Sequence, residues 1–276
     1  MPHNILVIVG MHRSGTSLVT NWLEKCGLEV GERLEAATPS NINGHFEDLE
    51  FKILHEEVLT SKNLPSSGLV EVHDVDLSVY QTEKLKSIIN VKNKLYDQWG
   101  WKDPRTCLFL DTYRQLLPES KYLVVVRDYQ SVIDSLLRRD FLEIDKRRVS
   151  RHFFSKLIWN IFRRERQQKL YYQRNAEHYL KVWLAYNEEI LKTVKSIPQG
   201  DYLVINYAML EKRDNEVFNF LTEKWHFSLT YSSFKDIFKK SLMNSVKNME
   251  DFIQDKVLLM KADYIQTRLK SLTRYN

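Results

Sequence analysis

The stretch Ile5–Leu18, ILVIVGMHRSGTSL, constrains the fold of this chain more than any other. Its first five residues are apolar and mostly β-branched, which predicts a strand buried on both faces. Gly10 ends that strand, and a short loop leads into a helix expected to begin near Thr16. At such a helix N-terminus, unpaired N–H groups and the positive end of the helix dipole face one point. The stretch therefore predicts a binding site for an anion, most naturally a phosphate.

The loop departs from the common phosphate-binding loop at one position. The spacing of its two glycines fits the first half of the pattern G-x-x-x-x-G-K-[ST], but Thr16 occupies the lysine position. A kinase or GTPase needs that lysine on the β- and γ-phosphates, and an aspartate for Mg²⁺ after a neighbouring strand. The apolar stretch Tyr122–Val126 is followed by Arg127 instead. A site with Arg13 and Arg127 and few metal ligands suits a nucleotide with separate phosphate groups and no metal-bound triphosphate.

A strand, a polar residue at its carboxyl end and then a helix recur along the chain. Tyr122–Val126 precedes a helical pattern over 130–139, and Tyr202–Asn206 precedes another over 209–225. Repeated units of this kind predict an α/β fold, a P-loop-like three-layer architecture with a central parallel sheet flanked by helices. We expect one domain over 1–276, with a helical C-terminal tail. Ligands of such sheets gather at the carboxyl ends of the strands.

The formal net charge of +5 is concentrated in one segment. From Arg138 to Arg174 there are 12 Lys or Arg against 4 Asp or Glu, so this segment carries +8 and the rest of the chain −3. A general nucleic-acid-binding surface is therefore not indicated. Three interpretations of this basic segment stay open: a solvated helix face, a lid over the acceptor or an acidic substrate, or peripheral contact with a membrane through its amphipathic residues 153–170.

Composition favours a cytoplasmic enzyme. The two cysteines, Cys26 and Cys107, lie in apolar contexts and offer neither a disulfide framework nor a metal-ligand spacing. No run of about 18 apolar residues suggests a membrane span, and the first residues carry no signal-peptide pattern.

Four motifs together resemble those of the sulfotransferases that use 3′-phosphoadenosine 5′-phosphosulfate (PAPS). His12–Leu18 is similar to the family's 5′-phosphosulfate loop, in the arginine-containing form of carbohydrate, tyrosylprotein and many bacterial members. Val126–Asp128, with Ser135 further along, resembles the 3′-phosphate motif. Trp101–Arg105 resembles the Lys-Asp-Pro segment beside the transferred group. Val204–Tyr207 looks like the strand and tyrosine near the adenine, although the next residue is alanine where the family usually has an acidic one.

The resemblance implies a PAPS-dependent sulfotransferase, with PAP as the product and no metal ion. The residues expected to bind the co-substrate are Arg13, Ser14, Gly15, Thr16 and Ser17 at the 5′-phosphosulfate, Arg127 and Ser135 at the 3′-phosphate, and Tyr207 at the adenine. Arginine suits a phosphate because it binds two oxygens at once. Arg13 and Lys102 are expected to stabilise the charge that develops during transfer.

A hydroxyl acceptor needs a general base, and three residues compete for that role. Glu47 is favoured because Gly44–Glu47 resembles a Gly-x-x-Glu segment of some bacterial family members. His45, with an ordinary histidine pKa near ~6.5, is an alternative that could equally orient the acceptor. Asp48 stays open as a third candidate.

The expected reaction is metal-independent, in-line transfer of a sulfuryl group from PAPS to a hydroxyl or amine. The acceptor would be a small molecule, a carbohydrate or a lipid, and the basic helical segment 138–192 would cap the acceptor side of the site. Two alternatives stay open: a P-loop-type kinase or NTPase, and a non-catalytic nucleotide-binding module associated with a membrane. No nucleic-acid partner is expected. The sequence leaves the acceptor's identity and the oligomeric state open.

Overall fold

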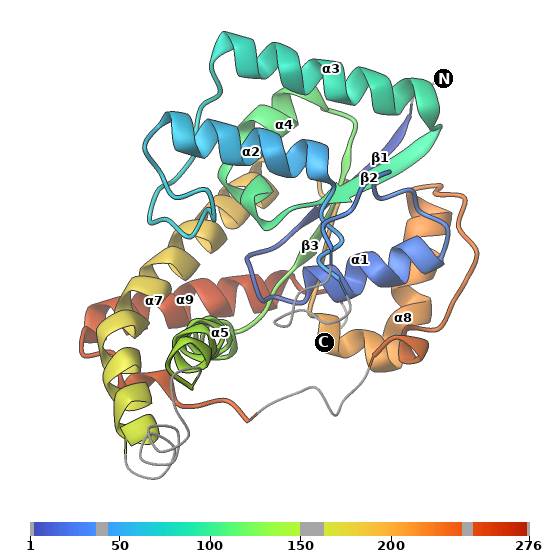
Figure 1. The fold of residues 1–276 in the computed structure, drawn as a ribbon. Helices are drawn as coiled ribbons and strands as arrows, with labels where there is room; N and C mark the ends of the chain where they lie inside the picture. The colour runs from blue at the N-terminus through green and yellow to red at the C-terminus, as the bar shows by residue number, and fades with distance from the viewer. Residues whose placement is uncertain (1–2, 37–43, 150–162, 239–244, 275–276) are drawn as a thin grey trace.

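The computed structural model describes residues 3–36, 44–149, 163–238 and 245–274. It contains a parallel sheet between two layers of helices (Figure 1). The strands are β1 (Asn4–Val9), β2 (Gln98–Lys102), β3 (Lys121–Val125) and β4 (Tyr202–Ile205). They lie in the order β2-β1-β3-β4, and each neighbouring pair is parallel. The predicted α/β fold is confirmed.

Both faces of the sheet are buried, as the unbroken apolar strands predict. Successive residues of a strand point to opposite faces, so Val7 and Ile8 of β1 belong to two different cores. Val124 and Val125 of β3 divide in the same way. The sheet is therefore a partition between two separate sets of packed side chains.

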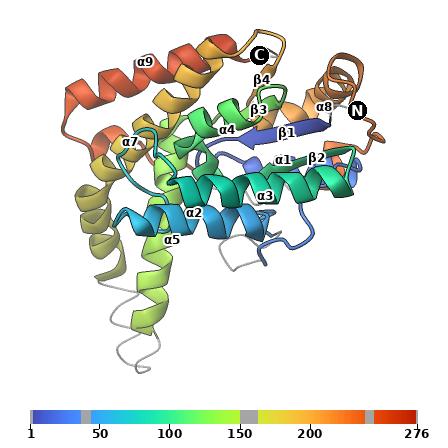
Figure 2. The same cartoon turned by 90° about the horizontal axis from the view of Figure 1, so that it is seen from above.

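The two helical layers differ in size (Figures 1 and 2). One face, here called the α1 face, is covered by α1 (Thr16–Lys25) and α8 (Leu210–Asn219). The opposite face, the α7 face, is covered by α2 (Leu49–Ser61), α3 (Val79–Leu95), α4 (Leu110–Leu116), α5 (Tyr129–Val149), α7 (Arg164–Ser196) and α9 (Lys256–Leu272).

Residues Pro104–Leu108 form a 3₁₀ turn that precedes α4. Two helices differ from the sequence expectation. α5 continues past residue 139 to Val149. The tail becomes a long helix only at α9, where the side chain of Asp255 accepts a hydrogen bond from Leu258 N and caps the first turn.

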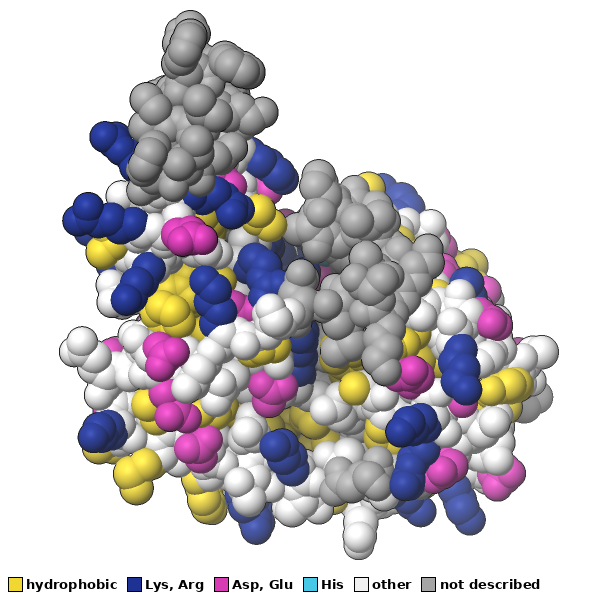
Figure 3. All heavy atoms as spheres, turned by 90° about the horizontal axis from the view of Figure 1, so that it is seen from below, with side chains coloured by type: hydrophobic (Ala, Val, Ile, Leu, Met, Phe, Trp, Pro, Cys, Tyr) yellow, Lys and Arg dark blue, Asp and Glu magenta, His cyan; other side chains and the backbone are white. Residues whose placement is uncertain are grey.

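α5 and α7 pack side by side and extend away from the sheet (Figure 2). The hydroxyl of Tyr172 on α7 donates to Oδ1 of Asp134 on α5 at 3.1 Å. Lys and Arg side chains gather near the outer end of this pair (Figure 3).

Most of the amphipathic segment 153–170 falls on residues 150–162, which lie outside the described residues. Among the described residues, no helix is long and apolar enough to cross a membrane.

Candidate active site

The loop between β1 and α1 presents the N-terminus of α1. Gly15 is the N-cap residue, and no side chain of the described residues caps the first turn. Arg13 and Gly15 have positive φ angles of 66° and 95°, a conformation that arginine rarely adopts. Ser14 N donates to Met11 O at 3.1 Å and closes the turn. The backbone therefore has the geometry of an anion site.

Gly15 also lies directly against the ring of Tyr207. A Cβ atom at Gly15 would lie 2.5 Å from Cδ1 of Tyr207. We expect Gly15→Ala to lower the free energy of unfolding by about 2–4 kcal/mol, because it adds a steric clash to an already strained backbone. Urea denaturation measures the change.

Gly27→Ala is the matched control for this variant. Gly27 has the same φ of +95°, but no atom lies within 4 Å of the position where its Cβ would be. Its replacement should therefore cost only the backbone strain, about 1 kcal/mol. Equal losses in the two variants would show that the contact with Tyr207 carries no energy.

Three predicted phosphate ligands come together beside this loop. Arg13 Nε donates to Ser135 Oγ at 2.9 Å, and Arg127 Nη1 donates to Arg13 O at 2.9 Å. Burial and the nearby charges of Arg139 and Arg127 lower the pKa of Arg13 to about 10. A bound anion would stabilise the positive charge of Arg13, because it would offset the charges of its neighbours.

Tyr207 completes this end of the site from the 3₁₀ turn after β4. Its ring is buried against Gly15, and the guanidinium carbon of Arg127 lies 5.7 Å from the ring centre. The alanine after Tyr207 donates its backbone N–H to Asn206 Oδ1 at 3.0 Å, which begins a 3₁₀ turn. The residues predicted at the 3′-phosphate and the adenine are thus neighbours in space.

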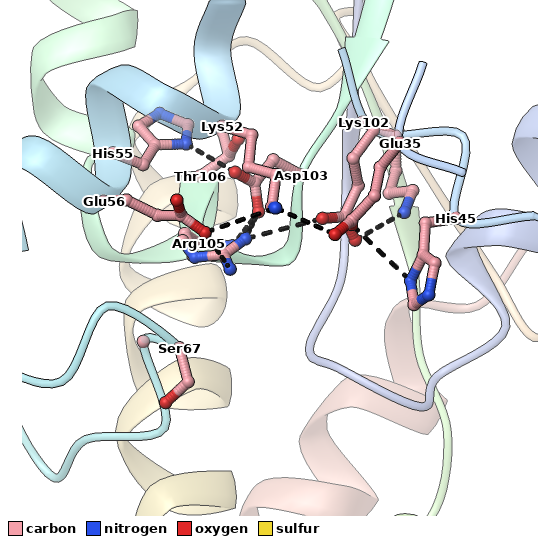
Figure 4. Close-up of polar contacts among 12 residues, drawn as sticks. Glu35, His45, Lys52, His55, Glu56, Ser67, Lys102, Asp103, Arg105 and Thr106 are labelled. Atoms are coloured by element: carbon pink, nitrogen blue, oxygen red, sulfur yellow. Dashed lines mark hydrogen bonds and ion pairs between the residues drawn. The ribbon is translucent and has the colours of Figure 1, made fainter. Parts of the chain in front are cut away.

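A second group of charged residues lies at the ends of β2 and α2 (Figure 4). Lys102 Nζ donates to Glu47 Oε1 at 2.9 Å and to Ser17 Oγ at 3.2 Å. Arg105 Nη1 lies 3.5 Å from the other carboxylate oxygen, Glu47 Oε2. Lys102 is 1% exposed and Glu47 5%. The predicted base and the predicted charge-stabilising lysine are therefore a buried pair beside the first turn of α1.

Burial raises the pKa of the Glu47 carboxyl group to about 7, although Lys102 and Arg105 favour its charged form. A general base works best when its pKa lies near the operating pH. Glu47 therefore has the proton affinity that this role requires.

Asp103 fixes the position of Arg105. Its carboxylate accepts hydrogen bonds from the backbone N and Nη1 of Arg105, both at 2.9 Å, and lies 2.9 Å from His55 Nδ1. Burial opposes the charge of Asp103, but Arg105 and His55 outweigh it and hold its pKa well below the usual range. His55 Nε2 is 2.7 Å from the Tyr113 hydroxyl, so an Nδ1–H donor toward Asp103 and an acceptor at Nε2 satisfy the whole network.

His45 and Asp48 are less suited than Glu47 to act as the base. Burial lowers the pKa of His45, whose Nδ1 lies 3.7 Å from Glu35 Oε2. Asp48 is the N-cap residue of α2 and accepts a hydrogen bond from buried Lys92 at 2.6 Å. Its oxygens are thus engaged in holding α2 and α3 together.

One group of described residues has metal-ligand chemistry: Glu35, His45 and Glu47, whose ligand atoms lie within 4.8 Å of one another. Lys52 Nζ lies 2.8 Å from Glu35, and Lys102 Nζ lies 2.9 Å from Glu47. These ammonium groups already neutralise the carboxylates and would repel a divalent cation. We therefore assign no metal site to this group.

Sequence reasoning missed three residues that the fold brings to the site. Arg105 was part of a predicted motif but had no role, and Glu35 belonged to no motif at all. His12 lies in the loop itself, and its Nε2 is buried without a hydrogen-bond partner among the described residues. Burial and the charge of Arg105 lower the pKa of His12, which keeps the imidazole neutral. Only the position of His12 in the loop could have drawn attention to it.

The chain is an α/β protein with a parallel sheet, and its uncapped helix N-terminus and two arginines lie where proteins of this class bind anions. Residues 6–226 match the sulfotransferase family, and the chain belongs to that family of enzymes.

Solved structures show the same fold. The chain resembles the sulfotransferase domain of the Synechococcus PCC 7002 olefin synthase, with a TM-score of 0.52 and 14% identity over 98% of this chain and 95% of that one. A sulfotransferase of Mycobacterium avium gives a TM-score of 0.58 and 11% identity over 97% of this chain and 77% of that one.

Curated relatives match a shorter part of the chain. A Caenorhabditis elegans protein provisionally named a protein-tyrosine sulfotransferase is 35% identical over 75 residues, 27% of each chain. A Caenorhabditis briggsae protein of the same name is 37% identical over 75 residues, 27% of this chain and 25% of that one. The chain spans about a quarter of the length of these relatives.

Proposed function

We propose that the protein transfers a sulfuryl group from PAPS to a hydroxyl or amine of an acceptor, without a metal ion. One observation supports this most: the Arg13–Ser135–Arg127 group and the Lys102–Glu47 pair flank the same uncapped helix N-terminus. One group suits the phosphates of a nucleotide, and the other suits an acceptor hydroxyl. The position between them, at the first turn of α1, suits the group that is transferred.

The residues present fit PAPS better than a nucleoside triphosphate. Arg127 and Ser135 would hold the 3′-phosphate, and Tyr207 would lie near the adenine. The N–H groups and hydroxyls of Ser14–Ser17 would hold the 5′-phosphosulfate. The buried position of Arg13 beside the positive charges of Arg139 and Arg127 favours a ligand with several separate negative charges.

The proposed reaction needs one proton transfer and one displacement. The acceptor oxygen forms a bond to sulfur as the bond between sulfur and the 5′-phosphate oxygen breaks, which releases PAP. The acceptor proton goes to Glu47. Arg13 and Lys102 stabilise the charge on the oxygens during transfer, and Lys102 leaves Glu47 in part to do so.

The acceptor class is proposed as a small molecule, a carbohydrate or a lipid that enters beside α5 and α7. The segment 138–192 is proposed as the cap over this side, within one domain that spans 1–276. The curated relatives add a peptide tyrosine to the acceptors worth testing. An acceptor screen with labelled PAPS, read by mass spectrometry, covers all four classes.

A thermal-shift experiment separates this proposal from a kinase or NTPase. We expect PAP to raise the melting temperature in the presence of EDTA, because every proposed contact is made by the protein itself. At a PAP concentration about 100 times its Kd, the stabilisation should be about 2.7 kcal/mol. Mg²⁺-ATP should give a much smaller shift, and stabilisation by Mg²⁺-ATP alone would overturn the proposal.

A further inference from the structure

A cavity lies beside Arg127, at the edge of the candidate active site. It has a volume of about 400 Å³ and lies at the carboxyl ends of β3 and β4, where α7 and the last turns of α9 close it. Small-molecule sites commonly have volumes of about 300–1,000 Å³. Arg127 is the proposed co-substrate ligand among the lining residues, and Val126, Asp128 and Asn206 line the cavity as its neighbours in the 3′-phosphate and adenine motifs.

The cavity and the nucleotide end of the active site lie on opposite faces of the sheet. Its apolar wall is made by Val126, Trp183 and Leu269, which belong to the core of the α7 face. Tyr207, proposed beside the adenine, belongs to the core of the α1 face. A ligand in the cavity would therefore be separate from the adenine end of the nucleotide, with Arg127 between the two.

Trp183 contributes an unsatisfied hydrogen-bond donor. The side chain lines the cavity and is 1% exposed, and its indole Nε1 has no hydrogen-bond partner among the described residues. Buried N–H groups are nearly always paired, so an exception beside a cavity points to a partner that occupies it.

Two amide side chains at the cavity also present donors. Asn206 Oδ1 accepts from Ala208 N and Gln266 Oε1 from Tyr129 N, both at 3.0 Å. These bonds use the amide oxygens and leave the NH₂ groups, which only donate. The cavity also has the positive charges of Arg127 and Lys270 against the single carboxylate of Asp128.

We propose that this cavity binds a small organic carboxylate with an apolar body. The carboxylate would accept hydrogen bonds from the Trp183 indole and the two amides, and the apolar body would pack on Val126 and Leu269. A surplus of donors with net positive charge selects an anion, and the apolar wall selects one larger than an inorganic ion.

Arg127 couples the two sites. It lines the cavity, and its Nη1 donates to Arg13 O in the nucleotide loop at 2.9 Å. A carboxylate in the cavity would take up part of the positive charge of Arg127, so it should weaken PAP binding. Thermodynamic linkage requires PAP to weaken the binding of the carboxylate by the same factor. We expect a factor of about two to five, because the ligands share one residue and no space.

Calorimetric titration with benzoate tests the proposal, with benzamide as an uncharged probe of the same shape. We expect benzoate to bind one site per chain, and benzamide to bind at least tenfold more weakly. Trp183→Phe and Lys270→Met should each weaken benzoate at least fivefold. Lys256→Met, at the exposed far end of α9, is the control and should change nothing. Because Trp183 is a core residue, Lys270→Met keeps the test valid if Trp183→Phe does not fold.

The same titration in saturating PAP decides which site is occupied. If benzoate still binds in saturating PAP, with a Kd raised by no more than about fivefold, the result supports a separate cavity. Binding that falls in proportion to the PAP concentration would place benzoate in the nucleotide site and overturn the proposal. Absence of saturable benzoate binding, or equal binding of benzamide, would overturn it as well. The titration without PAP does not depend on the proposed function, so the two proposals fail separately.

Discussion

Replacing Arg127 by methionine should raise the Kd for PAP by about 100-fold. Arg127 donates to the carbonyl of Arg13 and lies beside the Tyr207 ring, so its loss removes a phosphate ligand and loosens the loop at once. Hydrogen bonds to charged groups contribute roughly 1.5–3 kcal/mol, and each 1.4 kcal/mol is a factor of ten. Isothermal titration with PAP measures the change.

Two further arginine variants make this experiment specific. Arg127→Lys keeps the charge but loses the several N–H donors of the guanidinium group, which can reach both Arg13 O and a phosphate. An intermediate loss of PAP affinity is therefore expected. Arg114→Met removes a half-buried arginine that pairs with Asp111 on α4 and should leave PAP binding unchanged. A rise of less than threefold in Arg127→Met would argue against any contact of this residue with the 3′-phosphate.

Glu47→Gln should lower kcat by about 1,000-fold and leave the Kd for PAP within a factor of about three. General bases contribute roughly 100- to 10,000-fold, and a glutamine keeps the shape of the side chain without its basicity. The rate is measured with an acceptor returned by the labelled-PAPS screen. Glu50→Gln, on the exposed side of the first turn of α2, is the matched control.

The pH dependence gives this prediction a second readout. Because burial raises the pKa of Glu47 to about 7, the active carboxylate form is lost as the pH falls below that value. The rate should then fall about tenfold per pH unit, and this dependence should vanish in Glu47→Gln. A wild-type rate that stays level from about pH 7 down to pH 5 would exclude Glu47 as the base.

The raised pKa of Glu47 also makes the free energy of unfolding depend on pH. The direction is opposite to that of the rate, because the rate falls as the pH falls whereas the stability rises. The protonated form of Glu47 is favoured in the folded state, since its pKa is raised from 4.5 to about 7. Its stabilising contribution is complete below about pH 4.5 and is lost as the pH rises through about 7. The wild type should therefore lose stability relative to Glu47→Gln over that range, as urea denaturation can measure.

The fold could be predicted from the sequence because its strongest signals are local. The apolar runs of β1 and β3 are buried on both faces, and each is followed at once by a polar residue and a helix. Parallel strands bring their carboxyl ends to one edge, so the approach of Arg127 to the loop of Arg13 followed from topology. The roles of these residues remain predictions.

The acid–base end of the site depends on packing between distant segments. The pairing of Lys102 with Glu47 requires α2 to lie against β2, where Phe51 stacks on Trp101 with ring centres 4.6 Å apart. Nothing in the sequence pattern indicates that contact. The hydrogen bond from Lys92 of α3 to Asp48 is a second contact of this kind. Sequence periodicity predicts helices and strands, but it does not predict ion pairs between segments that are distant in the sequence.

The two cores on either side of the sheet support different parts of the candidate site. Tyr207 is supported by the core of the α1 face, whereas Phe51 and Trp101, beside the Lys102–Glu47 pair, belong to the core of the α7 face. Substitutions that repack one core should leave the other undisturbed, because distant changes usually add independently. In the proposed enzyme, substitutions around Phe51 and Trp101 should therefore alter the acceptor side of the site while the packing that supports Tyr207 stays intact. The separation of the two cores would let the acceptor side diverge without repacking the core that supports Tyr207.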